Sequence, residues 1–369
     1  MKVNLNLAPI ENWIPGLKEP LVISGPCSAE SEEQVMAVAK ALESNSRVKV
    51  FRAGIWKPRT RPNSFEGIGE VGLKWLKRVK DETSLLTSVE VAKASHVELA
   101  LKYDVDIIWI GARTSVNPFS VQEIADALKG VDIPVLVKNP INPDLQLWVG
   151  ALERINQAGI TKLGAIHRGF SPLSDSDYRN EPMWSIPVEL ERMIPNLPII
   201  CDPSHIAGNR VLIEPVCQKA YDLQMNGLMI ESHMDPDNAL SDAKQQITPK
   251  TLDKILDRLI IRTPATSDVD FELRLKELRK KIDQIDHDLL EAMGARMKVA
   301  EEIALHKKEH KITILQTGRY DELMNDRIDQ GKKFHLKEDF VKELYEMIHE
   351  NSIRRQTQIM NEKSAEKAE

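Results

Sequence analysis

Basic side chains stand at the ends of successive apolar runs in the first part of this sequence. The six are Arg52, Lys57, Arg59, Arg113, Lys138 and Arg168. If the runs are neighbouring strands, these cations meet on one surface, where they repel one another unless anions lie among them. The pattern therefore indicates a site for one or two substrates that carry phosphate or carboxylate groups. Pairing with nearby carboxylates is the alternative, and it explains one such cation more readily than six.

A second set of residues at the run ends has the chemistry of a metal site. Cys27, His205, Glu231 and Asp242 offer one thiolate, one imidazole and two carboxylates. This mixed set suits Mn, Fe, Co or Zn. The spacing is neither CxxC nor HExxH, so the ligands would come from separate strands. Taken singly, Cys27 reads as a small buried residue and His205 as a core histidine, and His233 is a rival ligand.

Two cations interrupt an apolar helical stripe in the last quarter of the chain. Arg296 falls where the rhythm of apolar residues demands another one, and Lys307 follows eleven residues later. At about 100° per residue the two side chains point within roughly 20° of each other. Since a charge on a buried face is costly unless it is paired, the pair indicates an anion site. Snorkelling of both side chains to water is the alternative.

Eight short apolar runs must position the first two sets. They span residues 21–25, 48–53, 84–90, 106–112, 134–139, 162–166, 197–202 and 227–232, with amphipathic stretches such as 31–44 and 120–130 between them. This alternation predicts an α/β fold, a (β/α)8 TIM barrel with its active site at the carboxyl ends of the strands. An open doubly wound sheet is the alternative, but the first turn, GPCSAES, is neither GxGxxG nor a P-loop.

The polar segment RTPATSDVD (262–270) separates this barrel from a helical region. Apolar residues recur at steps of three and four over 271–310, and two further helices fit around 319–331 and 337–361. The sequence therefore predicts a separate all-α domain of three helices. The expected division is barrel 1–262, linker 263–271, helical domain 272–361 and a frayed, charged tail 362–369.

Composition excludes several classes of protein. The chain has 369 residues, a net charge of −6 and three cysteines. The mild negative charge argues against a general nucleic-acid binder. Cys27, Cys201 and Cys217 are too few and odd in number for a disulfide framework, so Cys201 and Cys217 are interpreted as core residues. With neither a signal peptide nor an apolar run long enough to span a bilayer, a cytoplasmic protein is expected.

Ordered motifs across residues 20–260 resemble type I 3-deoxy-D-arabino-heptulosonate 7-phosphate (DAHP) synthases. They are GPCSAES, FRAGIWKPRTRPNSFEG, IGAR, VLVKNP, HRGF, CDPSH and GLMIESH followed by SDAKQ. The resemblance implies condensation of phosphoenolpyruvate with erythrose 4-phosphate in the aromatic amino-acid (shikimate) pathway, with release of phosphate. It also implies one divalent metal ion, Mn²⁺ first among Mn, Fe, Co and Zn, held by Cys27, His205, Glu231 and Asp242.

The same resemblance assigns the cations to substrates. Phosphoenolpyruvate would be held at its phosphate by Arg113, Lys138 and Arg168, and at its carboxylate and reacting centre by Arg52 and Lys57, while Arg59 and Thr60 position erythrose 4-phosphate. Lys57 is also the expected proton donor to the new hydroxyl, with a metal-bound water as the alternative. The nearest alternative is an octulosonate-phosphate synthase, which takes a pentose phosphate. The discriminating motif is KPRT (57–60).

The segment LRKKIDQIDHDLLEAMGARMKVAEEIALHKK (278–308) and the two helices after it resemble the all-helical, type II chorismate mutases. These rearrange chorismate to prephenate by holding one conformer and stabilising charge on the ether oxygen. By resemblance, the carboxylates bind Arg279 and Arg296, the ether oxygen faces Lys307 and Gln356, and the pocket is completed by Arg319 and Ser352. Tyr320 and Gln316 replace a Glu and an Asp of the family, a departure that bears on recognition of the substrate hydroxyl.

A second copy of the chain is expected to supply Arg279. Arg279 lies some 80–100° around the helix from Arg296 and Lys307, and a helix of about 40 residues is roughly 60 Å long. Both points favour a homodimer through the helical domain. Two hypotheses then compete: two working enzymes on one chain, or a synthase with a helical dimerisation or sensor module that does not turn over. Because the barrel has only a short N-terminal extension, the helical domain is also expected to regulate the synthase allosterically.

Overall fold

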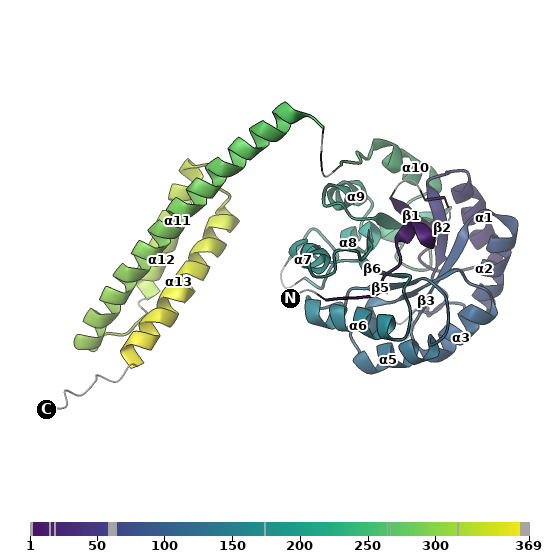
Figure 1. The fold of residues 1–369 in the computed structure, drawn as a ribbon, viewed down its shortest axis with the longest axis horizontal. Coiled ribbons are helices and arrows are strands. Elements are labelled where there is room, and N and C mark those ends of the chain that lie inside the picture. Colours follow the sequence, from purple (N-terminus) through teal and green to yellow (C-terminus); the bar gives the residue numbers. More distant parts are fainter. Residues whose placement is uncertain are drawn as a thin grey trace. The chain divides into compact units, whose positions relative to one another are not determined.

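The chain folds into two compact units, residues 1–264 and residues 265–369 (Figure 1). The computed structural model describes residues 3–14, 16–17, 20–57, 65–172, 175–263, 265, 267–315 and 317–361. Arg59, Thr60 and Gln316, which the sequence analysis singled out, lie outside these residues.

Eight parallel strands form a closed barrel in sequential order, and β8 pairs back onto β1. They are β1 (Leu21–Gly25), β2 (Val48–Ala53), β3 (Leu86–Val91), β4 (Ile107–Ile110), β5 (Val135–Lys138), β6 (Leu163–His167), β7 (Ile199–Cys201) and β8 (Gly227–Glu231). The predicted TIM barrel is confirmed. The run expected at 106–112 is shorter as a strand, because Gly111 ends β4 and begins a short helix, α4 (Ala112–Ser115).

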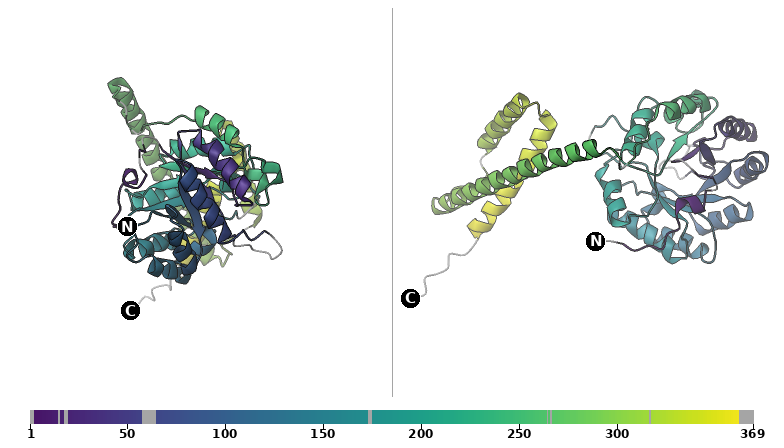
Figure 2. Two further views of the ribbon diagram at one scale, coloured as in Figure 1. Left: turned by 90° about the vertical axis from the view of Figure 1, so that its right-hand side faces the viewer. Right: turned by 45° about the horizontal axis from the view of Figure 1, so that its top comes forward.

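Helices surround the barrel and connect its strands (Figure 2). They are α1 (Glu32–Glu43), α2 (Val71–Glu82), α3 (Ala94–Lys102), α5 (Pro118–Ala127), α6 (Leu145–Gln157), α7 (Ser185–Met193), α8 (Pro203–Ala207), α9 (Ile213–Asp222) and α10 (Pro249–Arg258), with 3₁₀ turns η1 (Ile10–Asn12), η2 (Pro236–Asn238) and η3 (Ala243–Gln245). Several begin at a side-chain cap, for example Ser31 accepting from the Gln34 backbone N–H and Asp202 accepting from that of His205.

Two apolar layers hold the barrel together. The outer layer lies between strands and helices and includes Val89, Trp148 and Leu252. The inner layer contains Trp109 and Met229 together with residues that precede β1, such as Ile10 and Ile14. The segment before β1 therefore packs into the barrel interior. The carboxyl ends of the strands carry polar and charged side chains instead.

Three helices make up the second unit, as predicted. α11 (Val269–Glu309) and α12 (Thr317–Lys333) both pack against α13 (Glu338–Asn361). The first part of α11 extends beyond the other two helices (Figure 1). α11 starts inside the expected linker, because the Asp268 side chain accepts a hydrogen bond from the Phe271 backbone N–H and caps it there.

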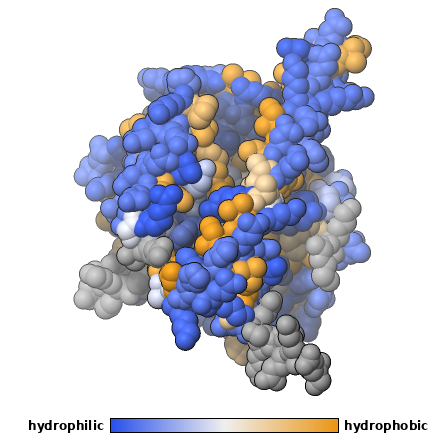
Figure 3. Space-filling model, turned by 90° about the vertical axis from the view of Figure 1, so that its left-hand side faces the viewer, coloured by the Kyte–Doolittle hydropathy of each residue, from blue (hydrophilic) through white to orange (hydrophobic). Residues whose placement is uncertain are grey.

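The helical unit leaves many apolar side chains in water. On α11 they include Leu278, Ile282, Ile285, Leu289, Leu290 and Val299, each at least 41% exposed. Orange patches of such residues stand among hydrophilic ones in the space-filling view (Figure 3). None of the described helices has both the length and the apolar character needed to cross a membrane.

Gly25, the last residue of β1, has a backbone that only glycine tolerates well. Its φ is 150°, and an added Cβ would collide with the backbone carbonyl of Arg52. We expect Gly25→Ala to destabilise the barrel by roughly 1–3 kcal/mol through overpacking. Gly150 in α6 has open space around it, so Gly150→Ala should be neutral or stabilising.

Tryptophan fluorescence during denaturant unfolding measures this effect selectively. All six tryptophans, Trp13, Trp56, Trp75, Trp109, Trp148 and Trp184, lie in the barrel unit. An unchanged midpoint for Gly25→Ala would show that the strand end adjusts without cost.

Candidate functional site

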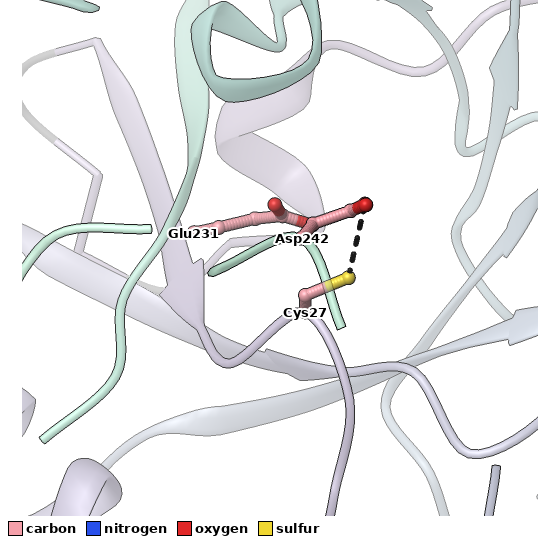
Figure 4. Close-up of side chains that lie close together, drawn as sticks. All are labelled: Cys27, Glu231 and Asp242. Atoms are coloured by element: carbon pink, nitrogen blue, oxygen red, sulfur yellow. Dashed lines mark hydrogen bonds between the residues drawn. The ribbon is translucent and has the colours of Figure 1, made fainter. Parts of the chain in front are cut away.

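Three predicted metal ligands meet at the carboxyl ends of the strands (Figure 4). Cys27 follows β1, Glu231 ends β8 and Asp242 immediately precedes η3. One ligand atom from each lies within 4.8 Å of the others. The Cys27 thiol donates to Asp242 Oδ2 over 3.4 Å. The structure therefore brings together side chains that are distant in the sequence, as the barrel topology predicts.

His205 in α8 adds an imidazole nitrogen to this cluster. Its Nε2 lies 3.7 Å from Glu231 Oε1 and 3.9 Å from Asp242 Oδ2. Its Nδ1 is 2.9 Å from Asp202 Oδ1. A carboxylate on one ring nitrogen leaves the other as the ligand, the usual arrangement around protein-bound metals. The rival, His233, instead accepts from the Asp235 backbone N–H and lies 3.6 Å from Glu30.

The thiol of Cys27 is neutral in this environment. Burial, and then the charge of Glu231, raise its pKa to about 12, although Lys57 opposes the shift. The Lys57 ammonium donates to Cys27 Sγ over 3.0 Å. A bound divalent cation would favour the thiolate form that ligates metals. The donor set and its spacing therefore fit a borderline divalent ion.

Three of the predicted cations are buried beside the cluster. Arg52 is 1% exposed, and its guanidinium donates to Glu231 Oε1 over 3.2 Å and lies over the Trp109 ring. Lys138 is 4% exposed and donates to Asp202 Oδ2 over 2.7 Å. Burial opposes ionisation of Asp202, but His205 and Lys138 hold its pKa well below the usual range.

Arg168 has fewer counter-charges. It follows β6, is 9% exposed and donates to Asn180 Oδ1 over 2.6 Å. Burial lowers its pKa to about 10, helped by the nearby Arg179 and Arg113 against the opposing effect of Asp202. Excess positive charge of this kind favours a bound anion. Arg113 itself is exposed on α4.

A second pocket lies within the helical unit. It is a cavity of about 610 Å³ between α11, α12 and α13. The predicted residues that line it are Arg296, Lys307, Arg319, Ser352 and Gln356. Arg296 donates to Ser352 Oγ over 2.7 Å. Its size is typical of small-molecule sites, and its three cations suit a dianion.

Arg279 does not line this pocket. It is exposed on α11, 17 residues before Arg296, or roughly 25 Å along the helix axis. Tyr320 does line the pocket, and its ring packs against that of His349 with centroids 4.6 Å apart. Burial, and then Arg296 and Lys307, lower the pKa of His349.

Several site residues were not singled out from the sequence. Asp202 bridges Lys138 and His205, and Gln245 and Arg179 contact the two carboxylates of the cluster. Asp202 belongs to the CDPSH motif at the end of β7, so its place in the chain was a usable signal. Gln245 likewise ends the SDAKQ motif, three residues after Asp242, whereas for Arg179, which lies in an irregular connection, the sequence carries no such signal.

A closed (β/α)8 barrel with charged and metal-binding side chains at the carboxyl ends of its strands is the architecture of an enzyme. Comparison with known proteins gives its family. Residues 6–263 match the model of the DAHP synthetase I family. The chain belongs to that family. Residues 278–357 match the model of chorismate mutase type II. Both resemblances stated from the motifs are thereby confirmed.

Individual relatives agree. A phospho-2-dehydro-3-deoxyheptonate aldolase from Thermotoga maritima is 34% identical over 226 residues, 61% of this chain and 64% of that protein. The chain thus spans less than two thirds of that relative's length. A 2-dehydro-3-deoxyphosphooctonate aldolase from Desulfotalea psychrophila is 29% identical over an alignment that covers 65% of this chain and 88% of that aldolase.

A solved DAHP synthase structure from Thermotoga maritima superposes with a TM-score of 0.59 at 31% identity, covering 65% of this chain and 67% of that one.

Proposed function

We propose that this chain is a bifunctional enzyme of the shikimate pathway, a DAHP synthase joined to a chorismate mutase. The observation that carries the synthase half is the meeting of Arg52, Lys138 and Arg168 with the cluster of Cys27, His205, Glu231 and Asp242 at one end of the barrel. Such a mouth suits an anionic substrate beside a cation, and phosphoenolpyruvate carries both a phosphate and a carboxylate.

The five described cations would divide between the phosphate and the carboxylate of phosphoenolpyruvate. Lys138 and Arg168, with the exposed Arg113, would hold the phosphate, and Arg52 and Lys57 the carboxylate and reacting centre. Fixed cations around the phosphate stabilise the charge that develops as it leaves. Arg59 and Thr60, proposed for erythrose 4-phosphate, lie outside the described residues.

Cys27, His205, Glu231 and Asp242 would hold one divalent ion, with Mn²⁺ proposed first. When bound, it supplies Lewis acidity to polarise a carbonyl oxygen. The protein's own groups do the rest. C3 of phosphoenolpyruvate bonds to the aldehyde carbon, whose oxygen takes up a proton. Water adds at C2 and gives up its protons, and the C2–O bond to phosphate breaks as the C2 carbonyl forms and phosphate leaves. Lys57, whose Nζ lies 3.0 Å from Cys27 Sγ, would give a proton to the aldehyde oxygen as it becomes the new hydroxyl, with a metal-bound water as the alternative donor.

Chelation tests this proposal. We expect the consumption of phosphoenolpyruvate in the presence of erythrose 4-phosphate to stop after EDTA treatment and to return on addition of Mn²⁺. The reason is that EDTA removes the metal ion, and the nearby Lys and Arg side chains cannot replace it as a Lewis acid. The consumption of phosphoenolpyruvate is followed by its ultraviolet absorbance. Turnover with arabinose 5-phosphate but not with erythrose 4-phosphate would contradict the assignment and favour an octulosonate-phosphate synthase.

In the helical unit, the carrying observation is the pocket lined by Arg296, Lys307 and Arg319. Three cations match the two carboxylates and the developing ether-oxygen charge of chorismate. Its rearrangement needs no nucleophile or general base, only a held conformer and electrostatic stabilisation. Lys307 and Gln356 would face the ether oxygen, with Ser352 and Arg319 completing the pocket.

A second copy of the chain would complete this pocket. Arg279 is too far along α11 to reach it from the same chain. The apolar residues around it, including Leu278 and Ile282, are exposed, as expected of a face that another copy covers. We therefore propose a homodimer through the helical unit in which each chain gives Arg279 to its partner's pocket.

The helical unit would also regulate the barrel. It offers a pocket for a later compound of the same pathway, and a ligand that favours one arrangement of the units shifts the synthase rate. We expect prephenate or chorismate to change that rate in the parent but not in Arg319→Ala, whose pocket lacks one cation. Rates unaffected by prephenate, chorismate and the aromatic amino acids would contradict the idea.

A further inference from the structure

Gln245, the last residue of η3, lies between the two carboxylates of the metal cluster. It is 1% exposed. Its amide nitrogen donates to Glu231 Oε2 over 2.7 Å and to Asp242 Oδ2 over 3.4 Å. One neutral side chain thus contacts two anions that repel each other. An amide cannot replace them as a charged ligand, but its two N–H groups can hold both in place.

Arg179 fixes the direction of this amide. Its guanidinium donates to Gln245 Oε1 over 2.5 Å and lies 3.0 Å from Asp242 Oδ1. Because a guanidinium only donates, the oxygen of the Gln245 amide must face Arg179 and the nitrogen must face the carboxylates. The two residues therefore act as one unit.

The shorter contacts of this pair go to Asp242 Oδ1 and Glu231 Oε2, while the longer Gln245 contact, 3.4 Å, goes to Asp242 Oδ2. Arg179 holds Oδ1 of Asp242, which leaves Oδ2 near Cys27 Sγ and His205 Nε2. Gln245 takes Oε2 of Glu231, which leaves Oε1 3.7 Å from His205 Nε2. Each carboxylate is thereby turned so that its other oxygen faces the common centre.

The segment that carries Arg179 is fastened to the helix that carries His205. The Arg179 and Asn180 backbone N–H groups donate to the carbonyls of Ala207 and Ile206, and the Asn180 amide donates to the carbonyl of His205 over 2.6 Å. Gly208, with φ 67°, leaves the room that the Arg179 side chain fills. Movement of this segment would therefore disturb His205 and Asp242 directly, and Glu231 through Gln245.

We propose that Arg179 and Gln245 are positioning residues that set the affinity of the Cys27, His205, Glu231 and Asp242 site for a divalent cation. This inference rests on the proposed metal-dependent synthase. Outer contacts of this kind typically change metal affinity by about 10–100-fold when they are removed. Charge alone predicts the opposite for Arg179, since removing a nearby cation should strengthen the binding of another cation.

The test is Mn²⁺ binding to the full-length protein, measured as free Mn²⁺ by electron paramagnetic resonance. We expect Gln245→Leu and Arg179→Met each to weaken binding by about 10–100-fold. Matched controls are Gln218→Leu and Arg192→Met, which remove a half-buried glutamine of α9 and an exposed arginine of α7, both away from the metal cluster. Neither control should change the affinity.

Two further readouts separate positioning from general damage. The midpoint of unfolding followed by tryptophan fluorescence in EDTA should match the parent for Arg179→Met, whose side chain is 46% exposed. The visible spectrum of the Co²⁺-loaded protein should change in both variants, because that spectrum depends on ligand geometry.

The outcomes are distinct. Affinity within about twofold of the parent in both variants, or tighter binding by Arg179→Met, would overturn the inference while leaving the metal site standing. A parent protein that binds no divalent cation would overturn the proposed metal site and this inference together.

Discussion

The Cys27→Ala variant is expected to lose synthase activity by about 1,000-fold or more, at a Mn²⁺ concentration that saturates the parent protein. A metal acting as a Lewis acid contributes several kcal/mol to such a reaction, and each 1.36 kcal/mol is a factor of about ten in rate. Cys27 is fully buried and is the one sulfur ligand of the proposed set. Its loss also removes the acceptor of the Lys57 ammonium.

Three measurements on one preparation check this result. They are the rate of phosphoenolpyruvate loss, the Mn²⁺ content after gel filtration, and the rate of chorismate disappearance. The last should equal that of the parent, because Cys27 belongs to the barrel unit. Cys217→Ala is the matched control, since this thiol is also fully buried but lies in α9 away from the cluster.

A Cys27→Ala protein that retained both metal and rate would show that the three remaining ligands suffice. A variant that lost metal but kept its rate would contradict metal dependence itself. Cys217→Ala is expected to keep its metal even if the small cavity lowers the stability of the barrel.

The barrel was predictable because its strands are buried on both faces. Such strands appear as short runs of Val, Ile and Leu, and β1 and β2 begin and end where those runs do. Topology then places every run end at one mouth, which is why Cys27, Glu231 and the buried cations could be grouped without a structure. The length of β4 was not predictable from the apolar run, because Gly111 leaves the strand and becomes the first residue before α4 in an extended conformation that any residue can adopt.

The residues that orient the ligands escaped prediction for a physical reason. Arg179 reaches Gln245 across 66 positions of sequence. Arg179 belongs to a connection without periodicity, and the SDAKQ motif that contains Gln245 does not by itself say that this side chain contacts the ligands. Their effect depends on which oxygen of Asp242 or Glu231 each one contacts, which is a matter of three-dimensional placement. The helical stripe behaved differently. Its period predicted α11, but the period does not say which part of the stripe packs within one chain, where Ala300 and Ala304 of α11 are buried and Leu278 and Ile282 are exposed.

Arg296→Ala and Arg279→Ala are each expected to lower mutase turnover by about 100- to 1,000-fold, the cost of removing one donor to developing negative charge. Arg296 lines the pocket and is oriented by Ser352, whereas Arg279 would act from the partner chain. Arg354→Ala is the matched control, because this exposed arginine of α13 pairs only with Glu350 among the described contacts. It should leave the rate unchanged.

Co-production of the two inactive variants tests the shared pocket. In a mixed dimer, the chain with intact Arg296 receives an intact Arg279 from its partner, while the other pocket lacks both. With random pairing, half of the dimers are mixed and one of their two pockets works, so we expect about one quarter of the parent's activity. The rate of chorismate disappearance, with each variant produced alone as reference, measures the recovery.

Recovery to that level would require both a dimer and the exchange of Arg279. A mixture no more active than its components would contradict the exchange, because a pocket built within one chain cannot be repaired by another. A parent that binds prephenate without turning over chorismate would favour the sensor module instead. In that case Tyr320, which lines the pocket and packs against His349, is the first residue to change to Glu, the residue that the resemblance implies at this position.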